Sequence, residues 1–339
     1  MAKRKPLLGA LNLMLGKFGY QAVQIRKLYD WQRQPAGRFH GDTPLPDGAA
    51  QYLTADNPRL KDLSARYAKM DARVTTPLIW RAGHMIDEDL RYFRGDNPYV
   101  WQLRGGFAEL HYVLTTYYVK QIDRLGLLDK LTEDGAFGAL TFSIAGRTVS
   151  RDLLDSVVEI NFLDRHLGLS EARGLNILDI GAGYGRLASR ALQALAGIGT
   201  YFCTDAVAAS TFVSEYYLRF RGLGDRAQVV PLDELDRLAG ADIGLAINIH
   251  SFSECTVAAI DWWIARIAAL GVPRLMVVPN PGKHGGARLL TNTGEDFQPI
   301  IERPGYKLIA KEPKYADPAV QRYGIYPSYY YLFELTPGS

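Results

Sequence analysis

The stretch NILDIGAGYGRL, residues 176–187, places an acidic residue and three alternating glycines between a strand pattern and a helix pattern. The apolar residues up to Asp179 are typical of a buried strand, and GRLASRALQALA from Gly185 onward is typical of an amphipathic helix. Glycine adopts positive φ without strain and lets a ligand approach the backbone closely, so Gly181, Gly183 and Gly185 predict a ligand-binding turn. The stretch therefore predicts the first strand-turn-helix unit of an α/β fold.

The second half of the chain alternates between short β-branched runs and longer helical patterns. This alternation is typical of a parallel sheet whose strands are joined by helices. The last two strand patterns have only a linker between them, so we expect them to pair antiparallel as a hairpin. We predict a Rossmann-like α/β sheet of seven strands over residues 175–181, 199–205, 227–232, 242–249, 273–280, 305–313 and 328–336. The predicted helices between them cover 185–196, 208–223, 233–240 and 253–270.

The first half of the chain shows no strand alternation and is predominantly helical up to about residue 170. Apolar residues recur at three- and four-residue steps in 71–93, 107–128 and 150–169, as in helices that bury one face. We therefore predict two regions. Residues 1–150 form a helical region that shapes a substrate pocket or lid or makes oligomer contacts, and residues 151–339 form the ligand-binding sheet domain.

The composition is that of an ordinary globular protein of 339 residues, with 47% hydrophobic residues and a net charge of +3. Such a small charge creates no global field for nucleic acid or an acidic membrane. No stretch approaches the roughly 18 apolar residues of a membrane helix. Cys203 and Cys255 lie in separate apolar segments, as buried thiols do in a reducing compartment. We expect a cytoplasmic protein with a small-molecule substrate and no nucleic-acid or membrane partner, and a homodimer is compatible with the sequence.

The first forty residues form a basic arm, with eight Lys or Arg residues against Asp30 alone. The arm begins like a signal peptide, but Asn12 interrupts the apolar run and no small-residue cleavage site follows, so we do not predict export. Contact with an anionic surface, substrate or partner and a solvated face of a terminal helix are both open interpretations. The apolar residues that recur there at helical spacing are Leu7, Leu8, Leu11, Met14, Leu15 and Phe18.

The position of Asp179 separates two classes of ligand. A dinucleotide site has the spacing G-x-G-x-x-G and a helix N-terminus that faces a pyrophosphate. Here the third glycine comes one position early, and a carboxylate under the turn would repel a phosphate ~4 Å away by about 1 kcal/mol in water and several times more near a protein surface. S-adenosylmethionine has no phosphate, and its cationic sulfur and its ammonium group attract a carboxylate. The turn therefore favours S-adenosylmethionine over NAD, with S-adenosylhomocysteine as product.

Further polar residues end the later strands. Asp205 ends the second strand, where a carboxylate can hold both ribose hydroxyls or cap the next helix. After the third strand, Leu232 would pack on the adenine face and Asp233 would accept from its amine, although Asp233 equally suits a helix cap. Asn248 shares a strand face with His250 by two-residue alternation, so it is a candidate contact of the methionine end of the donor.

Residues 150 to about 335 resemble the sugar O-methyltransferases of natural-product and polysaccharide pathways, which are class I S-adenosylmethionine-dependent enzymes. The phrases that carry the resemblance are VSRDLLDSVVEINFLDRHLGL, NILDIGAGYGRLASRAL, DAVAASTFVSEYYLRFRG, VVPLDEL, INIHSFSEC and YYYLFEL. The resemblance implies methyl transfer to a hydroxyl of a sugar or a glycosylated natural product, as in antibiotic biosynthesis. The donor contacts that it implies are Asp179, Gly181, Ala182, Gly183, Asp205, Ala206, Leu232 and Asp233.

In-line methyl transfer to a sugar hydroxyl needs a base, because such a hydroxyl does not ionise near neutrality. His250 follows the fourth strand, whose carboxyl end opens onto the ligand crevice, and it is the first candidate base; a structural histidine is the alternative. Glu254 either orients His250 or forms a capping box with Ser251. His284 lies in a glycine-containing loop that resembles a mobile lid, and it is either a second candidate base or an exposed loop histidine.

Aromatic residues of the helical region are candidates for the acceptor pocket, because their rings can stack on sugar faces; a helical core stripe is the alternative. His84, Asp87 and Asp89 are too loosely spaced to predict a divalent metal site, so we predict no metal. The substrate candidates are Trp101, His111 and Tyr112.

Other functions stay open at the level of sequence. An O-methyltransferase of a polyketide or phenol would have less need of His250, because such a hydroxyl ionises easily. An S-adenosylmethionine-binding subunit without catalytic activity could use the helical region to engage a partner. An NAD-dependent oxidoreductase is disfavoured by Asp179 and by the glycine spacing.

Overall fold

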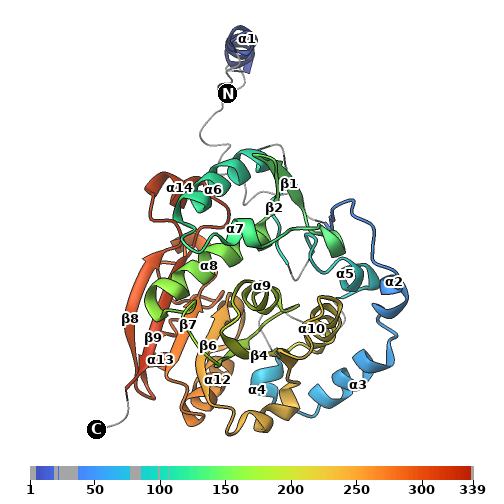
Figure 1. Cartoon of the computed structure of the whole chain (residues 1–339), viewed down its shortest axis with the longest axis vertical. Coiled ribbons are helices and arrows are strands. Elements are labelled where there is room, and N and C mark those ends of the chain that lie inside the picture. The colour runs from blue at the N-terminus through green and yellow to red at the C-terminus, as the bar shows by residue number, and fades with distance from the viewer. Residues whose placement is uncertain are drawn as a thin grey trace.

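A seven-stranded sheet forms the centre of the computed structural model, which describes residues 5–18, 22, 37–76, 85–97, 100–105 and 107–336. The strand order is β5-β4-β3-β6-β7-β9-β8 (Figure 1). The strands are β3 (Leu175–Ile180), β4 (Ile198–Thr204), β5 (Ala227–Val229), β6 (Ile243–Ile249), β7 (Arg274–Val278), β8 (Tyr306–Pro313) and β9 (Tyr329–Leu335). This sheet confirms the predicted α/β fold and its seven strands.

The directions of the strands also agree with the prediction. Strands β3 to β7 are parallel, while β9 runs antiparallel to both β7 and β8. Asp179 of β3 is opposite Cys203 of β4 and Ile247 of β6, so the carboxyl ends of these three strands meet at one edge. The order of the strands reverses between β3 and β6, and at such a switch point the loops diverge and leave a crevice.

The predicted connecting helices are present. They are α9 (Arg186–Ala194), α10 (Ala208–Phe220), the 3-10 helix η3 (Leu232–Leu238), α11 (Ser251–Glu254) and α12 (Val257–Ala269). Helix α8 (Arg151–Leu167) precedes the sheet, and α13 (Gln298–Glu302) and α14 (Pro318–Tyr323) lie in the last third of the chain, with α14 between β8 and β9. The single helix predicted over 253–270 is instead two helices, a difference that affects the site.

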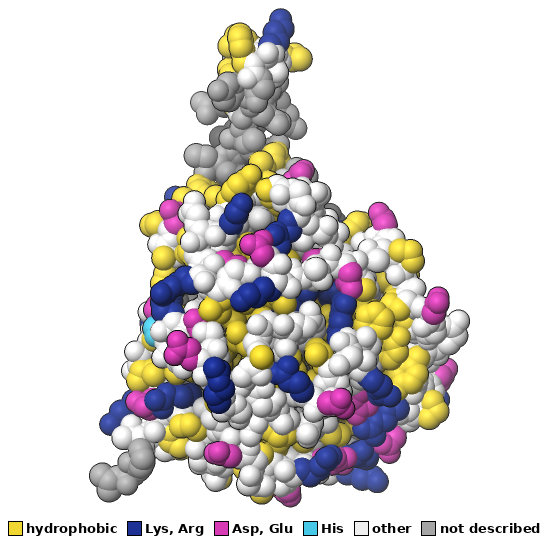
Figure 2. All heavy atoms as spheres, viewed as in Figure 1, with side chains coloured by type: hydrophobic (Ala, Val, Ile, Leu, Met, Phe, Trp, Pro, Cys, Tyr) yellow, Lys and Arg dark blue, Asp and Glu magenta, His cyan; other side chains and the backbone are white. Residues whose placement is uncertain are grey.

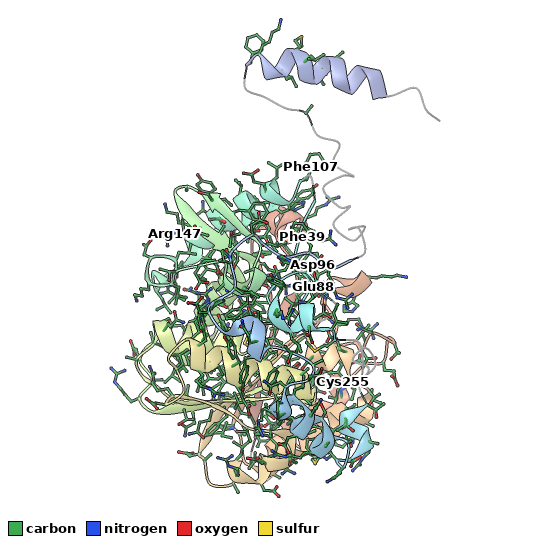
Figure 3. The ribbon with its side chains drawn as sticks, turned by 90° about the vertical axis from the view of Figure 1, so that its right-hand side faces the viewer. Phe39, Glu88, Asp96, Phe107, Arg147 and Cys255 are labelled. Carbon is green, nitrogen blue, oxygen red and sulfur yellow. The ribbon has the colours of Figure 1, made fainter. Side chains whose placement is uncertain are left out.

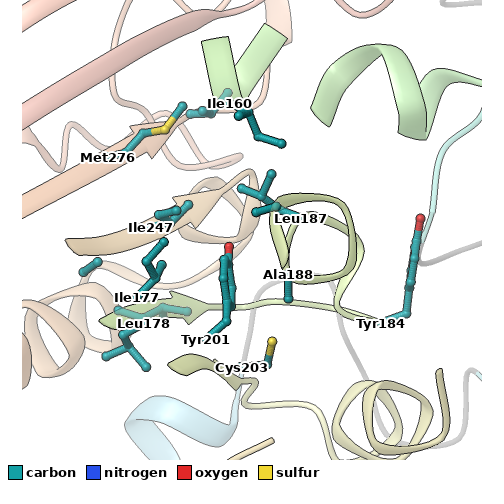
Figure 4. Close-up of a cluster of buried hydrophobic side chains, with 14 of the residues drawn as sticks. Ile160, Ile177, Leu178, Tyr184, Leu187, Ala188, Tyr201, Cys203, Ile247 and Met276 are labelled. Carbon is teal, nitrogen blue, oxygen red and sulfur yellow. The ribbon is translucent and has the colours of Figure 1, made fainter. Parts of the chain in front are cut away.

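The core lies between the sheet and the helices that cover it. Figure 4 shows Ile160 of α8 and Leu187 of α9 over Ile247 and Met276 of the sheet. The central strands are almost entirely apolar and buried, as expected for parallel strands covered on both faces. The buried polar side chains in β3, β4 and β6 are Asp179, Thr204 and Asn248. Of these Asp179 alone is acidic, which makes it a candidate functional residue.

The N-terminal region is mainly helical, with α1 (Lys5–Gly16), α2 (Ala49–Tyr52), α3 (Pro58–Tyr67), α4 (Ala72–Thr75), α5 (Asp87–Arg91), α6 (Ala108–Ile122), α7 (Leu127–Lys130) and the short 3-10 helix η2 (Ala136–Gly138). Helix α3 packs against α10, and the Tyr67 hydroxyl lies 2.8 Å from the Thr211 hydroxyl. Phe39 and Asp96 form an isolated bridge, and they lie close together in Figure 3. Helix α1 stands apart from the other elements in Figures 1 and 3.

One prediction for this half was wrong. The strands β1 (Thr141–Ile144) and β2 (Arg147–Ser150) form an antiparallel hairpin in a segment where no strand was expected. The hairpin is short, and its tight turn at Ala145 and Gly146 has positive φ at both residues. Four-residue strands are too short to show clear alternation in the sequence.

The surface bears both signs of charge. On the face drawn in Figure 2, basic and acidic side chains are interspersed over most of the sheet domain. Among the helices of the described residues, none combines the length and the apolar character that crossing a membrane requires.

Candidate functional site

A cavity of about 390 Å³ lies where the carboxyl ends of β3, β4 and β6 face the N-terminal region. Its volume falls within the range of small-molecule sites, and it lies at the switch point of the sheet, where such sites occur. Both halves of the chain contribute to its wall. The lining includes Met85, Phe93, Trp101, Arg151, Asp179, Gly181, Ala182, Gly183, Asp205, Ala206, His250, Glu254, Asn280 and Tyr326. Cys255, labelled in Figure 3, also belongs to the lining.

The glycine turn after β3 depends on backbone conformations that favour glycine. The φ angles are 72° at Gly181, 57° at Gly183 and 85° at Gly185. A Cβ on Gly181 would lie 2.1 Å from Oγ of Ser251, so Gly181 allows the turn to pack against the loop after β6. A Cβ on Gly183 would meet no atom within 4 Å, and Gly183 lines the cavity. The missing side chain of Gly183 therefore leaves room for a ligand.

Asp179 is buried under this turn, as the strand pattern predicted. Its Oδ2 accepts a hydrogen bond from the Tyr201 hydroxyl at 3.1 Å. Burial raises the pKa of Asp179 to about 7, because a charged carboxylate is poorly solvated there and the Tyr201 hydrogen bond and the positive charge of Arg186 compensate only in part. A cationic ligand would restore the ionised form.

Asp205 connects the glycine turn to the next helix. Its Oδ2 accepts from the backbone N–H of Gly183 at 3.1 Å, and its Oδ1 accepts from the N–H of Val207 at 2.8 Å. Burial raises the pKa of Asp205 to about 7 as well. The N-cap residue of α10 is Val207, so Asp205 lies two residues before the cap, and it lines the cavity.

Three of the predicted donor contacts do not lie in the cavity wall of the described residues. Leu232 is buried in the core, and Asp233 forms a bidentate ion pair with Arg66 at 2.7 and 2.8 Å. Asn248 is fully buried; its Nδ2 donates to the carbonyl of Ile180 at 2.9 Å, and its Oδ1 accepts from the N–H of Phe252. The side chain of Asn248 thus links β6 and the start of α11 to the end of β3, and it does not face the cavity.

His250 lies in the cavity wall in a strained backbone conformation. Its φ is 69°, which is unusual for a residue other than glycine, and Tyr326 opposite has a φ of 46°. The two rings meet edge to face with centroids 5.0 Å apart. Such strain is concentrated at functional sites, where the surrounding structure holds it in place. Burial, aided by Arg151, lowers the pKa of His250 well below its usual value, so its imidazole is neutral near pH 7.

The capping box predicted for Ser251 and Glu254 is absent. Helix α11 ends at Glu254, and α12 begins after Thr256, whose side chain accepts from the N–H of Ala259. The carboxylate of Glu254 instead accepts a hydrogen bond from Nδ2 of Asn280 at 3.0 Å. Glu254 is thus the last residue of α11, before the break between the two helices, and its carboxylate lies in the cavity wall.

Asn280 joins this group from the loop after β7. Its Oδ1 accepts from the Tyr326 hydroxyl at 3.0 Å while its Nδ2 donates to Glu254. Asn280 therefore links Glu254 to the tyrosine that packs against His250.

A buried ionic cluster forms the side of the cavity beside His250. Arg151 donates from Nε to Asp155 at 3.0 Å and from Nη1 to the carbonyl of Trp101. Lys314 also donates to Asp155, at 2.5 Å. The guanidinium of Arg151 lies 4.5 Å from the ring centroid of Tyr326 and 5.5 Å from that of Trp101. A cation in contact with aromatic rings is favourable, particularly when it is desolvated.

The structure places the three substrate candidates at different sites. Trp101 lines the cavity, and its ring centroid lies 4.9 Å from that of Tyr326. His111 and Tyr112 are buried in α6 away from the lining: Nδ1 of His111 is 2.5 Å from the carbonyl of Tyr323, and Tyr112 packs against Phe142. Of the three substrate candidates, the structure thus brings Trp101 alone to the cavity.

His284 belongs to the 3-10 helix η4 (Gly282–His284) and is not part of the cavity lining among the described residues. His250 is therefore the candidate base that lies in the cavity.

The residues considered for a metal site have other partners. Asp89 forms a bidentate ion pair with Arg38, and Asp87 accepts from the backbone N–H of Ala55 at 2.7 Å. His84 lies outside the described residues. Within the part of the chain that the structure describes, no group of three or more His, Cys, Asp or Glu side chains could hold a metal ion.

The cavity residues that the sequence reasoning missed include three with polar contacts near His250: Arg151, Asn280 and Tyr326. Arg151 lies at the start of the predicted helical pattern 150–169, so in the sequence its basic side chain resembles an ordinary surface residue. Asn280 and Tyr326 lie in loops, and only the positive φ of Tyr326 and the contacts across the cavity single them out. The nearest signal in the sequence is the polar residue at the end of a strand pattern, which applies to Asn280.

No protein-family model and no curated protein matches this sequence. Several solved structures are similar in fold. The [4+2]-cyclase SpnF and the magnesium protoporphyrin IX methyltransferase ChlM from Synechocystis PCC 6803 with bound SAM are each 15% identical, with a TM-score of 0.40 over 67% of this chain and 96% of theirs. The N,N-8-amino-8-demethyl-D-riboflavin dimethyltransferase RosA from Streptomyces davawensis is 21% identical, with a TM-score of 0.37 over 55% of this chain and 58% of its own. At these identities the likeness concerns the fold alone.

Proposed function

We propose that this chain is a class I methyltransferase that uses S-adenosylmethionine. The observation that carries the proposal is the pair of buried carboxyl groups, Asp179 and Asp205, beside a glycine turn in one cavity. In the described residues neither carboxyl group forms a hydrogen bond with a lysine or arginine side chain. Two buried acids favour a cationic ligand and disfavour a diphosphate.

The residues present fit this donor. Gly183 leaves open space toward which a ribose or methionine chain could extend, and Asp179 could pair with an ammonium group. Asp205 uses both oxygens on backbone N–H groups and still has lone pairs for ribose hydroxyls, because each carboxylate oxygen can accept twice.

We further propose that the acceptor is a hydroxyl of a sugar or glycosylated natural product and that His250 is the general base. The donor supplies a methyl group on cationic sulfur: the acceptor oxygen bonds to the methyl carbon, the carbon–sulfur bond breaks, and S-adenosylhomocysteine and a methyl ether form. The hydroxyl proton moves to His250. Nδ1 of His250 is enclosed and has no hydrogen-bond partner in the part of the chain that the structure describes, so Nε2 is the nitrogen that could take the proton.

A second acceptor class, the phenol or enol of a polyketide-type scaffold, is favoured by one observation. The lowered pKa of His250 makes it a weak base, and a weak base suits a hydroxyl that ionises easily. The aromatic faces of Trp101 and Tyr326 suit either a sugar face or a planar ring.

Calorimetry tests the donor assignment. Purified protein is titrated with S-adenosylhomocysteine and, separately, with NAD; we expect micromolar binding of the first and none of the second. Asp205→Ala should weaken the binding at least tenfold. Asp236→Ala is the matched control, because Asp236 pairs with Arg266 at the exposed surface away from the cavity. Tight binding of NAD without binding of S-adenosylhomocysteine would refute the proposal.

Release of S-adenosylhomocysteine in a panel of glycosides and phenols tests the chemistry. Turnover with one class assigns the acceptor, and product analysis by mass spectrometry locates the new methyl group. Donor binding without turnover on any member would favour a binding subunit over an enzyme.

A further inference from the structure

The guanidinium of Arg151 has an unused hydrogen-bonding edge in the cavity wall. The side chain is only 10% exposed, and its Nε and Nη1 are bound to Asp155 and to the Trp101 carbonyl. Nη2 takes part in none of the hydrogen bonds among the described residues, although Arg151 lines the cavity. Buried guanidinium groups satisfy their donors, so this edge requires an acceptor from a ligand or a water molecule.

The charges around Arg151 leave one positive charge uncompensated. Nζ of Lys314 donates to Asp155 and to two backbone carbonyls, and three donated hydrogen bonds require an ammonium group. Arg151 and Lys314 therefore share the single carboxylate of Asp155. The neighbouring Arg186 has its own carboxylate, Glu159, at 2.7 Å. The surplus positive charge thus lies with the residue that has the open donor.

The open edge lies on the acceptor side of the cavity. Arg151 packs against Tyr326 and Trp101, and the ring of Tyr326 in turn meets His250. Arg151 is also the charged group that most strongly lowers the pKa of His250. For the carboxyl group of Asp179, the positive charge with the largest effect is instead Arg186. Arg151 is therefore the charged group with the largest effect on the candidate base, which agrees with its contact with Tyr326.

We propose that the acceptor carries a carboxylate that binds Nη2 of Arg151, so the substrate is a hydroxy acid such as a uronic acid glycoside, with its ring against the aromatic wall that Trp101 and Tyr326 form. This inference depends on the proposed function. A charge-assisted hydrogen bond to a buried guanidinium is among the stronger polar contacts in proteins. The carboxylate stays unchanged in the reaction, while the hydroxyl forms the bond to the methyl carbon and loses its proton to His250.

The carboxylate that binds Arg151 could also belong to the donor, because the methionine part of S-adenosylmethionine ends in a carboxylate. The experiment separates the two sources with a pair of probes that differ in one group. 4-Nitrophenyl β-D-glucuronide carries a carboxylate where 4-nitrophenyl β-D-glucoside carries a hydroxymethyl group. Each is titrated by calorimetry into protein saturated with S-adenosylhomocysteine, and S-adenosylhomocysteine is titrated separately.

We expect wild type to bind the glucuronide at least tenfold more tightly than the glucoside. Arg151→Met should reduce the glucuronide affinity to that of the glucoside and change the affinity for S-adenosylhomocysteine less than twofold. The variant leaves Asp155 paired with Lys314. Arg190→Met is the matched control, because it also removes a buried cation while its carboxylate, Glu133, stays paired with Arg94; it should keep the preference.

Two results would overturn the inference. The first is equal affinity of wild type for the two glycosides, which includes no detectable binding of either. The second is a tenfold or larger loss of S-adenosylhomocysteine affinity in Arg151→Met, which would assign the arginine to the donor. The first result needs no variant and holds even if Arg151→Met does not fold. Failure of wild type to bind S-adenosylhomocysteine at all is a separate outcome that refutes the proposed function.

Discussion

The two ends of the cavity are built in different ways. The proposed donor end consists of one short stretch of sequence, the glycine turn with Asp179, completed by Asp205 at the end of the adjacent strand. The proposed acceptor end is assembled from segments far apart in the chain, with Arg151, His250 and Tyr326 in contact through their rings and charges. A local motif fixes the first end, whereas tertiary packing alone fixes the second. Variants at each end test whether turnover and donor affinity depend on different residues.

The largest effect is expected at the acceptor end. His250→Asn should lower turnover by roughly 10²- to 10⁴-fold, the usual range for loss of a general base. Asparagine tolerates the positive φ of this position, so the variant should fold. The turnover rate is measured from the amount of S-adenosylhomocysteine released at successive times.

The control for His250→Asn is its affinity for S-adenosylhomocysteine, which should stay within twofold of wild type. A comparable loss of both turnover and donor affinity would show that the two ends are not separate. Unchanged turnover would move the base elsewhere.

At the donor end, Asp179→Asn should weaken S-adenosylmethionine binding by about 100-fold. The amide keeps the size of the side chain but removes the charge that would face the ammonium group, and loss of one partner of a buried charge pair costs about 2–5 kcal/mol. Calorimetry with the donor measures the change. Glu171→Gln, at an exposed position after α8, is the control and should bind normally.

Sequence patterns predicted the donor end because its signals are local. The spacing of Gly181, Gly183 and Gly185 and the acid before them are visible without the fold, and so is the alternation that gives seven strands. Arg151 and Tyr326 carried no such signal, because a basic residue at a helix start and a tyrosine in a loop become functional only through their tertiary neighbours. Leu232, Asp233 and Asn248 show the opposite case. Each follows the expected strand pattern, but packing or an ion pair turns it away from the cavity.

A smaller effect is expected from Gly183→Ala. The added methyl group meets no protein atom, so the core is not disturbed, but it projects into the space left for a ligand, and a φ of 57° strains an alanine. The strain costs about 1–2 kcal/mol of folding stability. Because the methyl group occupies space that the donor would fill, donor affinity should fall about tenfold, equivalent to about 1.4 kcal/mol. Gly222→Ala is a matched control, because its φ of 69° and open surroundings are similar while it lies outside the cavity lining of the described residues. Equal donor affinity in both variants would show that the donor does not approach Gly183.

The smallest effect is a dependence of donor affinity on pH. The pKa of Asp179 in the empty cavity is raised to about 7, so the carboxyl group is mostly protonated at pH 6 and mostly ionised at pH 7.5. A cationic donor needs the ionised form, so its affinity should rise about eightfold between these values if one carboxyl group governs binding. The raised pKa of Asp179 has the opposite effect on the folding stability of the empty protein, which falls as pH rises. An acid whose pKa is higher in the folded protein than its unfolded value destabilises the empty fold increasingly as pH rises from about 4 to 7. Asp179→Asn should therefore raise the melting temperature of the empty protein at pH 8 and leave it unchanged at pH 4. A donor affinity that stays flat across this range, together with no gain in stability at pH 8, would mean that the carboxyl group is already ionised without a ligand and that its attraction for the donor is weaker than burial implies.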